Sequence, residues 1–355
     1  NNLGAVRIRI RSLLASMKKR EQNKELEKGS GNYAQVKKIF DKDMKKDYTI
    51  LIPQMAPIHF ELLEAAVASC GYKVELLRNC TQHTVETGLK YVNNDACYPS
   101  ILTTGQMIEA LESGKYDLNK TALIMSQTGG GCRATNYIGF IRKALKDAGF
   151  ANVPVISFNV VGMEKMPGFK ITIPMIERMI KCVVYADLLQ KMLTKNRAYE
   201  IHKGKTQKLF DEWMEKCKTL VVKSTMKEFK QSIYDIVNDF EKIELDTSVE
   251  KPKVGIVGEV LIKYHPFGNN FVADKLEKDS VIALKNSKKG YLLPCNIFEL
   301  ETKVKDILSI GNQTGEGWFL TAEMVEYIEH GIPNIVCVQP FACLPNHVVG
   351  KGVIK

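Results

Sequence analysis

Short apolar runs of strand type alternate with segments of helical spacing along most of the chain. In the first half, the strand-type runs are 48–53, 73–77, 121–126 and 153–158, and the helical patterns between them cover 59–70, 99–111 and 133–148. Strands that alternate with helices of this length indicate βαβ units and a parallel sheet. The pattern therefore predicts an α/β fold for this part of the chain.

The pattern changes after residue 171. Residues 172–246 lack strand signals and are rich in helix formers with apolar spacing, which predicts a helical hairpin or a small bundle. Alternation resumes at 253–260 and continues with a helix near 298–306, a strand-like segment at 307–311, a helix at 320–329 and a strand at 334–338. The polar stretch 272–292 supports no structural prediction.

We therefore expect an α/β protein in which two parallel-sheet domains are joined by a helical hairpin. The expected parts are a basic helical lead-in at 1–46, a first α/β domain at 47–171, the helical hairpin at 172–250 and a second α/β domain at 251–355.

The net charge of +10 comes mostly from the lead-in, because residues 1–46 hold 13 Lys and Arg against 5 Asp and Glu. A basic arm can bind nucleic acid, or it can be a solvated helical linker. No aromatic residue lies between Arg7 and Lys28, although a surface for single-stranded nucleic acid would need one. We therefore expect a linker and no nucleic-acid partner.

The chain carries no signal for a membrane or for export. It has no run of eighteen apolar residues, and no apolar segment with a cleavage site follows Asn1. We therefore expect a cytoplasmic protein, and we expect the sequence to be a piece of a longer one. The nine cysteines are odd in number, which argues against a disulfide framework and leaves reduced thiols, metal ligands or nucleophiles.

Three cysteines are predicted at junctions that lead into helices. Cys132 follows the strand 121–126, Cys343 follows the strand 334–338, and Cys97 lies in a polar loop just before a helix. Open parallel sheets build their sites beyond the carboxyl ends of their strands. A thiolate at a helix N-terminus is stabilised by the helix dipole and by free N–H groups, which makes it a better soft ligand.

Two of these cysteines share a Cys-x-Pro motif, one in each predicted α/β domain. The motifs are Cys97-Tyr98-Pro99 and Cys343-Leu344-Pro345. Proline cannot donate a backbone hydrogen bond and fixes its own φ, so it holds the turn open with the thiol projecting from it. Three thiolates from two domains suit an iron–sulfur cubane with one open iron.

Zinc is the competing metal, but the paired C-x2-4-C knuckles of structural zinc are missing from the sequence. For any single cysteine the alternative is a buried free thiol, and Cys70, Cys182 and Cys217 are interpreted in that way. Cys337 lies inside an apolar strand and is interpreted as core, although it stays open as a fourth ligand. Cys80 and Cys295 are left undecided.

Two glycine-rich turns are predicted to line the cofactor. Gly129, Gly130 and Gly131 form a strand-to-helix turn that lacks the ending of a P-loop, and close approach of the backbone to a cluster would explain the glycines. Gly315 and Glu316 lie in a similar turn before the helix at 320–329, where simple turn chemistry is the alternative.

Two histidines are candidate catalytic groups. His265 follows the strand at 253–260 and could donate a proton or hydrogen-bond a bound acyl group. His347 lies four residues after Cys343 and could protonate near the cluster. A structural histidine and a helix-cap histidine are the respective alternatives.

From about residue 48 to its end the chain resembles the 2-hydroxyacyl-CoA dehydratase and activase-related superfamily, including the double-cubane cluster proteins. The segments that carry the resemblance are KYVNNDACYPSILTTGQMIEAL, SQTGGGCRATNYIGFIRKALKDAGF, VGIVGEVLIKYHPFGNN and GNQTGEGWFLTAEMVEYIEHGIPNIVCVQPFACLPNHVVGKG.

The resemblance implies two flavodoxin-like domains around a cluster held by Cys97, Cys132 and Cys343, and it makes the chain the C-terminal region of a long activase-like protein. A single [4Fe–4S] cluster is expected, because only three ligands match and the double-cubane relatives need about twice as many; a double cubane is left open. The implied partner is an actin/Hsp70-like ATPase activase, fused upstream or separate, which carries its own iron–sulfur cluster. A homodimer is compatible with the resemblance.

Three functions follow. The first is a low-potential electron-transfer or reductase component of an anaerobic cytoplasm, which receives electrons from the ATPase and passes them to an acceptor. The second is a dehydratase, in which the open iron binds a 2-hydroxyacyl-CoA and one electron enables loss of water through a ketyl radical. The third is a metal-free module that binds a small molecule or regulates.

Overall fold

A computed structural model describes residues 37–93, 96–159, 164–248, 253–279, 296–340 and 342–353, together with Leu14, Met17 and Lys251. Residues 1–37 and 38–355 form two separate units. Most of the predicted lead-in at 1–46 lies outside the described residues. Its described end contains a short helix, α2 (Met44–Asp47), which leads into the first strand.

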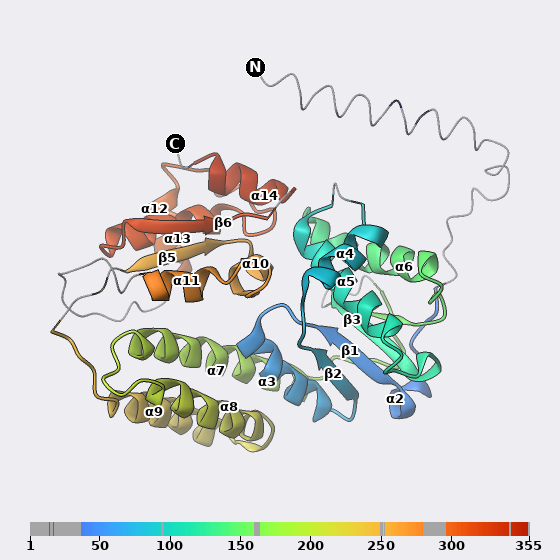
Figure 1. Cartoon of the computed structure of the whole chain (residues 1–355), viewed down its shortest axis with the longest axis horizontal. Coiled ribbons are helices and arrows are strands. Elements are labelled where there is room, and N and C mark those ends of the chain that lie inside the picture. The colour runs from blue at the N-terminus through green and yellow to red at the C-terminus, as the bar shows by residue number, and fades with distance from the viewer. Residues whose placement is uncertain are drawn as a thin grey trace. The chain divides into compact units, whose positions relative to one another are not determined.

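A four-stranded parallel sheet organises the N-terminal part of the second unit (Figure 1). Its strands are β1 (Thr49–Pro53), β2 (Lys73–Leu77), β3 (Thr121–Ser126) and β4 (Val155–Phe158), in the order β2-β1-β3-β4. In the register, Ile50 pairs with Val74 of β2 and with Ala122 of β3. The predicted parallel sheet is thus confirmed.

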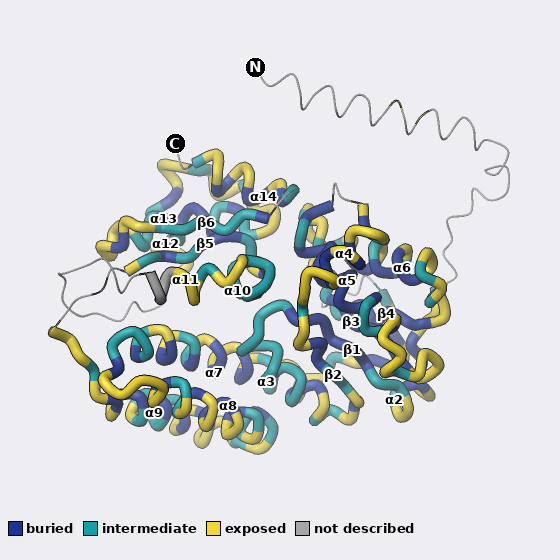
Figure 2. Tube along the Cα trace, in the orientation of Figure 1, coloured by how far each residue is buried: buried dark blue, intermediate teal, exposed yellow. Residues whose placement is uncertain are grey.

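Side-chain alternation along the strands builds one core on each face of this sheet. Leu51 and Leu123 join Met107 and Ile141 in one core, whereas Ile50 and its neighbours join Phe40 and Met175 in the other. Successive side chains of a strand point to opposite faces, so a strand buried on both faces must be apolar throughout. Figure 2 shows β1 and β3 largely buried beneath exposed helix surfaces, whereas β2, at the edge of the sheet, is exposed or half-buried over its first three residues.

Helices connect and cover the strands. They are α3 (Pro57–Ala68), α4 (Gln82–Tyr91), α5 (Tyr98–Glu112) and α6 (Tyr137–Asp147), with short 3-10 turns at Leu118–Lys120 and Arg133–Asn136. Helices α4 and α5 cross at two glycines. A Cβ atom on Gly88 would lie 2.2 Å from the carbonyl oxygen of Ile101, and one on Gly105 would lie 2.0 Å from that of Thr84.

The segment predicted as a hairpin contains three helices. They are α7 (Ile173–Arg197), α8 (Lys205–Lys223) and α9 (Met226–Glu241), and they pack with α3 around a core that includes Leu62, Tyr185 and Trp213 (Figure 1). A capping box of Thr225 and Glu228 starts α9. The prediction of a two-helix hairpin is therefore wrong, and the segment forms the small bundle that was the alternative.

The C-terminal part contains a second parallel pair, β5 (Val254–Gly258) and β6 (Asn334–Val338). Its helices are α10 (Val260–Tyr264), α11 (Val272–Asp279), α12 (Ile297–Val304), α13 (Trp318–Glu329) and α14 (Leu344–Asn346), followed by a π-helical turn at His347–Lys351. None of the helices in the described part of the chain is long and apolar enough to cross a membrane.

The strand predicted at 307–311 is wrong, because this segment forms turns in the structure. Leu308 packs into the neighbouring cores, but the hydroxyl of Ser309 accepts a hydrogen bond from the N–H of Gly311 at 3.2 Å. Local bonds of this kind compete with a sheet ladder for the backbone.

Candidate functional site

The structure places all three predicted cysteine ligands at helix N-termini. Cys97 is the N-cap of α5, Cys132 is the N-cap of the 3-10 turn at Arg133–Asn136, and Cys343 is the N-cap of α14. Each cap residue has extended backbone angles, so the chain turns into a helix immediately after each thiol. Pro99 and Pro345 lie in the first turns of their helices, where no N–H donor is required.

Each of the three sulfur atoms has a hydrogen-bonding neighbour. The hydroxyl oxygen of Tyr137 lies 2.9 Å from the sulfur of Cys97, and the side-chain amide of Asn346 donates to the sulfur of Cys343 at 3.2 Å. The backbone N–H of Ala134 donates to the sulfur of Cys132. Burial raises the pKa of Tyr137 far above its usual range, so its hydroxyl keeps its proton and can donate it to sulfur.

Two carboxylates adjoin the thiols. Glu259 follows β5 and accepts the N–H of Ile262 at 2.8 Å. Glu316 accepts the N–H of Val260 at 3.1 Å and the side-chain amide of Asn346 at 2.8 Å. Glu316 therefore connects the start of α10 to the turn that holds Cys343.

The site is thus lined by ionisable thiols and carboxyl groups. Burial raises the pKa of the Cys343 thiol to about 11, and it raises the pKa of Cys132; Glu316 and Glu259 push both in the same direction. Burial also raises the pKa of Glu259 to about 7, against the opposing effect of its bond to Ile262. Thiols and carboxylates that crowd together while losing water favour a cation among them.

The thiol of Cys132 interacts electrostatically with residues from both parts of the chain that build the site. Cys97 belongs to the N-terminal part, which holds the four-stranded sheet, and Glu316 and Glu259 belong to the C-terminal part, which holds β5 and β6. The turns that bear the glycines also meet, since a Cβ on Gly131 would lie 3.3 Å from the side chain of Thr314.

The predicted glycines permit these approaches in different ways. Gly129 has a φ of 79° and Gly315 a φ of 64°, both in the left-handed region that favours glycine. A Cβ on Gly315 would lie 2.9 Å from the ring of Pro345, so this glycine lets the turn pack against the Cys-x-Pro loop. A Cβ on Gly130 would meet open space, so its predicted role in cofactor binding stays a prediction.

The thiols do not converge on one point. Among the described residues, no three His, Cys, Asp or Glu side chains form a group that could hold a single metal ion. Zinc binds thiolates at about 2.3 Å, so the ligands of one zinc ion must nearly touch. A cluster differs from a single ion because it accepts thiolates on separate irons.

A buried polar atom beside Cys343 has no partner among the described residues. Asn346 is fully buried, and its Oδ1 atom accepts no hydrogen bond from any of them, while its Nδ2 atom donates to both Cys343 and Glu316. An unsatisfied acceptor in the interior costs about 1–3 kcal/mol unless a donor reaches it. This atom is therefore available to a group bound next to Cys343.

His265 belongs to the C-terminal part of the chain, contacts Gln106 of the N-terminal part and is 2% exposed. Its Nδ1 atom accepts the N–H of Gly268 at 3.0 Å, and its Nε2 atom lies 3.2 Å from the amide nitrogen of Gln106. The amide of Gln106 is oriented by paired bonds with the backbone of Gln54. Burial lowers the pKa of His265 to about 4, so the ring is neutral near pH 7, and its catalytic role stays a prediction.

His347 begins the π-helical turn after α14 and is exposed. Its backbone N–H donates to the carbonyl oxygen of Cys343 at 3.1 Å, and no hydrogen bond joins its side chain to a described residue. Its predicted role near the cluster also stays a prediction.

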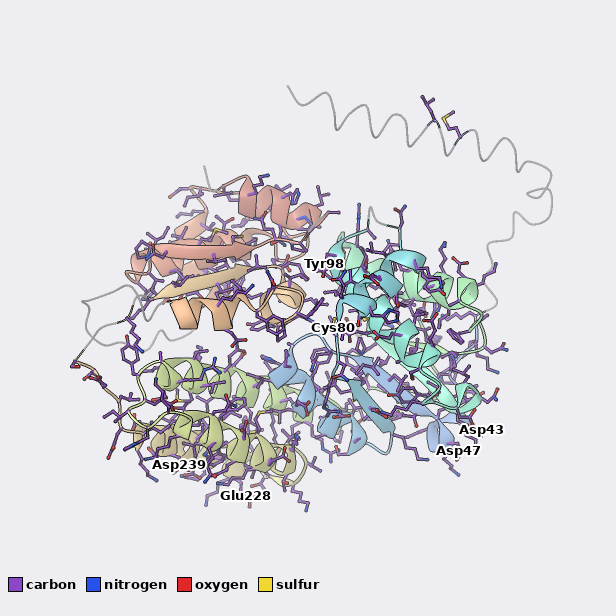
Figure 3. The ribbon with its side chains drawn as sticks, in the orientation of Figure 1. Asp43, Asp47, Cys80, Tyr98, Glu228 and Asp239 are labelled. Atoms are coloured by element: carbon purple, nitrogen blue, oxygen red, sulfur yellow. The ribbon has the colours of Figure 1, made fainter. Side chains whose placement is uncertain are left out.

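The other cysteines lie in several different surroundings. Cys182 and Cys217 belong to the core of α7, α8 and α9, and Cys337 accepts a hydrogen bond from the side chain of Gln339 at 3.2 Å and packs with the apolar side chains between β5 and α13. Cys295 lies outside the described residues. Cys80 follows β2 and lies near Tyr98, and both are labelled in Figure 3.

Sequence reasoning missed Glu259, Tyr137 and Asn346. Glu259 follows a strand as directly as Cys132 does, so the same rule of strand ends could have found it. Tyr137 carries no comparable signal, because it lies 40 residues from Cys97 and only the fold brings the two together. Asn346 lies three residues after Cys343, so a local contact at the start of a helix could have indicated it. Comparison with protein family models, with curated proteins and with solved structures finds no match to this chain.

Proposed function

We propose that this protein is the iron–sulfur component of a low-potential electron-transfer or reductase system. Cys97, Cys132 and Cys343 would hold the cluster, [4Fe–4S] in the simplest case. When bound, the cluster supplies a one-electron redox centre whose potential depends on hydrogen bonds to its sulfurs. The electrons would come from an ATP-hydrolysing activase, fused or separate, in a cytoplasmic, anaerobic setting.

The observation that carries the proposal is the matched environment of the three thiols. Each lies at a helix N-terminus, and each has a hydrogen-bonding neighbour: Tyr137, Ala134 and Asn346. Helix N-termini and N–H donors favour negative charge on sulfur, and at Cys132 and Cys343 the donors oppose burial, which raises the pKa of both thiols. A buried free thiol needs neither a helix N-terminus nor a hydrogen-bond donor. Chance is therefore a weak explanation for finding both features at three separate cysteines.

The strand order supports the finer fold assignment that we propose with it. The order β2-β1-β3-β4 corresponds to the first four strands of a flavodoxin-like sheet. In such sheets ligands bind where the strand order reverses, which is here between the carboxyl ends of β1 and β3. Gln54 follows β1, and the turn that ends at Cys132 follows β3.

Glu259 supports a second candidate, dehydration of a 2-hydroxyacyl-CoA. Because its pKa is about 7, a neutral solution contains both its protonated and its carboxylate form. A group with that property beside the thiols can hold or release a proton, which loss of water from a substrate requires and simple electron relay does not.

Anaerobic iron and sulfide analysis combined with EPR tests the proposal. We expect about four iron atoms and four sulfides per chain, and loss of the EPR signal in Cys97→Ser, Cys132→Ser and Cys343→Ser. Cys217→Ser is the matched control, because this thiol is buried in the core of the three helices and should leave iron content unchanged. Zinc without sulfide, or iron that survives all three substitutions, would refute the assignment.

A dehydration assay then separates the two candidates. If the protein reduces an acceptor but does not dehydrate any 2-hydroxyacyl-CoA under reducing, activase-coupled conditions, the reductase assignment holds. If it dehydrates one, Glu259→Gln should lower kcat while iron content stays the same. Iron-free protein that still binds a small molecule would instead identify a metal-free module.

A further inference from the structure

A separate cavity of about 490 Å³ lies at the amino end of β2, the opposite end of the strands from Cys132, which follows the carboxyl end of β3. It is bounded by α2, by the turn between α3 and β2, and by the segment that leads into α7. The turn at Cys70 and Tyr72 precedes β2, whereas Cys132 follows the carboxyl end of β3 in the same sheet. Since five strand residues span about 16 Å, this cavity does not share the thiol site.

Four cations line the cavity: Lys42, Lys45, Lys170 and Arg178. Among the described residues that line it, none is Asp or Glu. Nearby acids have other partners, since Asp41 accepts the N–H groups of Asp43 and Met44 and Glu177 pairs with Lys181 at 2.8 Å. The cavity therefore concentrates positive charge without an internal counter-charge.

Neutral groups hold two of these cations in place. Lys45 donates to the carbonyl oxygen of Cys70 at 3.3 Å, and its ammonium lies 4.3 Å from the ring centre of Tyr72. Arg178 donates from Nη1 to the hydroxyl of Ser69 at 2.9 Å and to the sulfur of Cys70 at 3.4 Å. These bonds fix the positions of both charges but do not neutralise them.

The guanidinium of Arg178 keeps donors for a ligand. Its hydrogen bonds to described residues all start at Nη1, so Nε and Nη2 have no protein acceptor among those residues. The loop opposite is ordered as well, because the N–H of Lys170 donates to the hydroxyl of Tyr72 at 3.0 Å. An oriented guanidinium fork with lysines around it is the arrangement that recognises phosphate oxygens.

We propose that this cavity binds a diphosphate group, either free or as part of a nucleoside diphosphate. Four cations match the charge of a diphosphate better than that of a single carboxylate, and the volume lies within the range of small-molecule sites. The proposal is independent of the cluster, because none of the lining residues is a site cysteine or contacts one in the described structure.

Isothermal titration calorimetry of the full chain with pyrophosphate tests the proposal. We expect saturable one-to-one binding that is at least tenfold tighter than binding of orthophosphate. Arg178→Gln should weaken it at least tenfold and Lys170→Gln about threefold. Lys208→Gln removes an exposed lysine of α8 that does not line the cavity, and it should leave affinity unchanged.

Two measurements keep the result interpretable. Far-UV circular dichroism and thermal melting establish that each variant is folded; if Arg178→Gln is not, the exposed Lys170 and Lys42 together replace it as Lys42→Gln/Lys170→Gln. Titration with ADP against pyrophosphate distinguishes a nucleotide from the free anion. Absence of saturable binding, or equal weakening by Lys208→Gln, would overturn the proposal.

Discussion

Substituting Gly105 by alanine tests the crossing of α4 and α5, the helix that begins at Cys97. An alanine normally stabilises a helix interior by about 1 kcal/mol relative to glycine. At Gly105 the new Cβ would lie 2.0 Å from the carbonyl oxygen of Thr84, so the helices must separate by about 1 Å to restore a distance of 3.0 Å. Overpacking of this kind costs about 3 kcal/mol when the obstacle is backbone. The expected net effect of Gly105→Ala is a destabilisation of about 2 kcal/mol.

Gly139 supplies the matched control. It also lies inside a helix, α6, but a Cβ there meets no atom of the described residues within 4 Å. Gly139→Ala should therefore stabilise the protein by about 0.5–1 kcal/mol. Urea denaturation of both variants measures the free energies of unfolding.

The same experiment has a consequence for the thiol site. A shift of α5 moves its N-terminus, so anaerobically prepared Gly105→Ala should hold less iron than wild type, whereas Gly139→Ala should hold the same amount. If Gly105→Ala stabilised the protein as much as Gly139→Ala does, the close approach of the two helices would be wrong.

Three further outcomes follow from the structure. The pKa of His265 is about 4 in the folded protein against about 6.5 in the unfolded chain, so the unfolded state binds the extra proton as pH falls. Lowering the pH from 7 to 5 should therefore reduce the free energy of unfolding by about 2 kcal/mol through this residue. In urea denaturation, His265→Gln should not show this part of the pH dependence. Tyr137→Phe removes the hydroxyl beside Cys97 and should make the cluster potential more negative at unchanged iron content in an EPR redox titration, whereas an unchanged potential would show that the hydroxyl does not donate to sulfur. Thr225→Ala breaks the capping box of α9 and should lower the free energy of unfolding, measured by urea denaturation, by about 1 kcal/mol. Thr194→Ala, which removes a threonine from the interior of α7 and not from a helix cap, is the comparison.

The ranges of several strands could be predicted from the sequence. The bounds of β2, β3 and β6 agree with their predicted ranges; β3 and β6 are short apolar runs between polar turns, whereas β2 (KVELL) carries Lys73 and Glu75 among its apolar residues. Helix α4 was not predicted. Its sequence QHTVETGLKY is mostly polar, and its Gly88 lowers helix propensity but is needed where the helix meets α5.

Part of the candidate site could also be predicted from the sequence, and part could not. The positions of Cys97, Cys132 and Cys343 at helix N-termini could be predicted, because strand ends and Cys-x-Pro motifs are local features. The contact of Tyr137 with Cys97 spans 40 residues of sequence and leaves no local pattern. The resemblance to the dehydratase and activase-related superfamily stays a prediction, since the comparisons find no match.

The spacing of the three thiols along the chain determines when the proposed centre can be assembled. Cys343 emerges from the ribosome 211 residues after Cys132, because 343 minus 132 is 211. At about 5–20 residues per second, the first two thiols wait roughly 10–40 s for the third. If these thiols hold the proposed cluster, metal loading during synthesis would meet an incomplete ligand set until Cys343 has been translated.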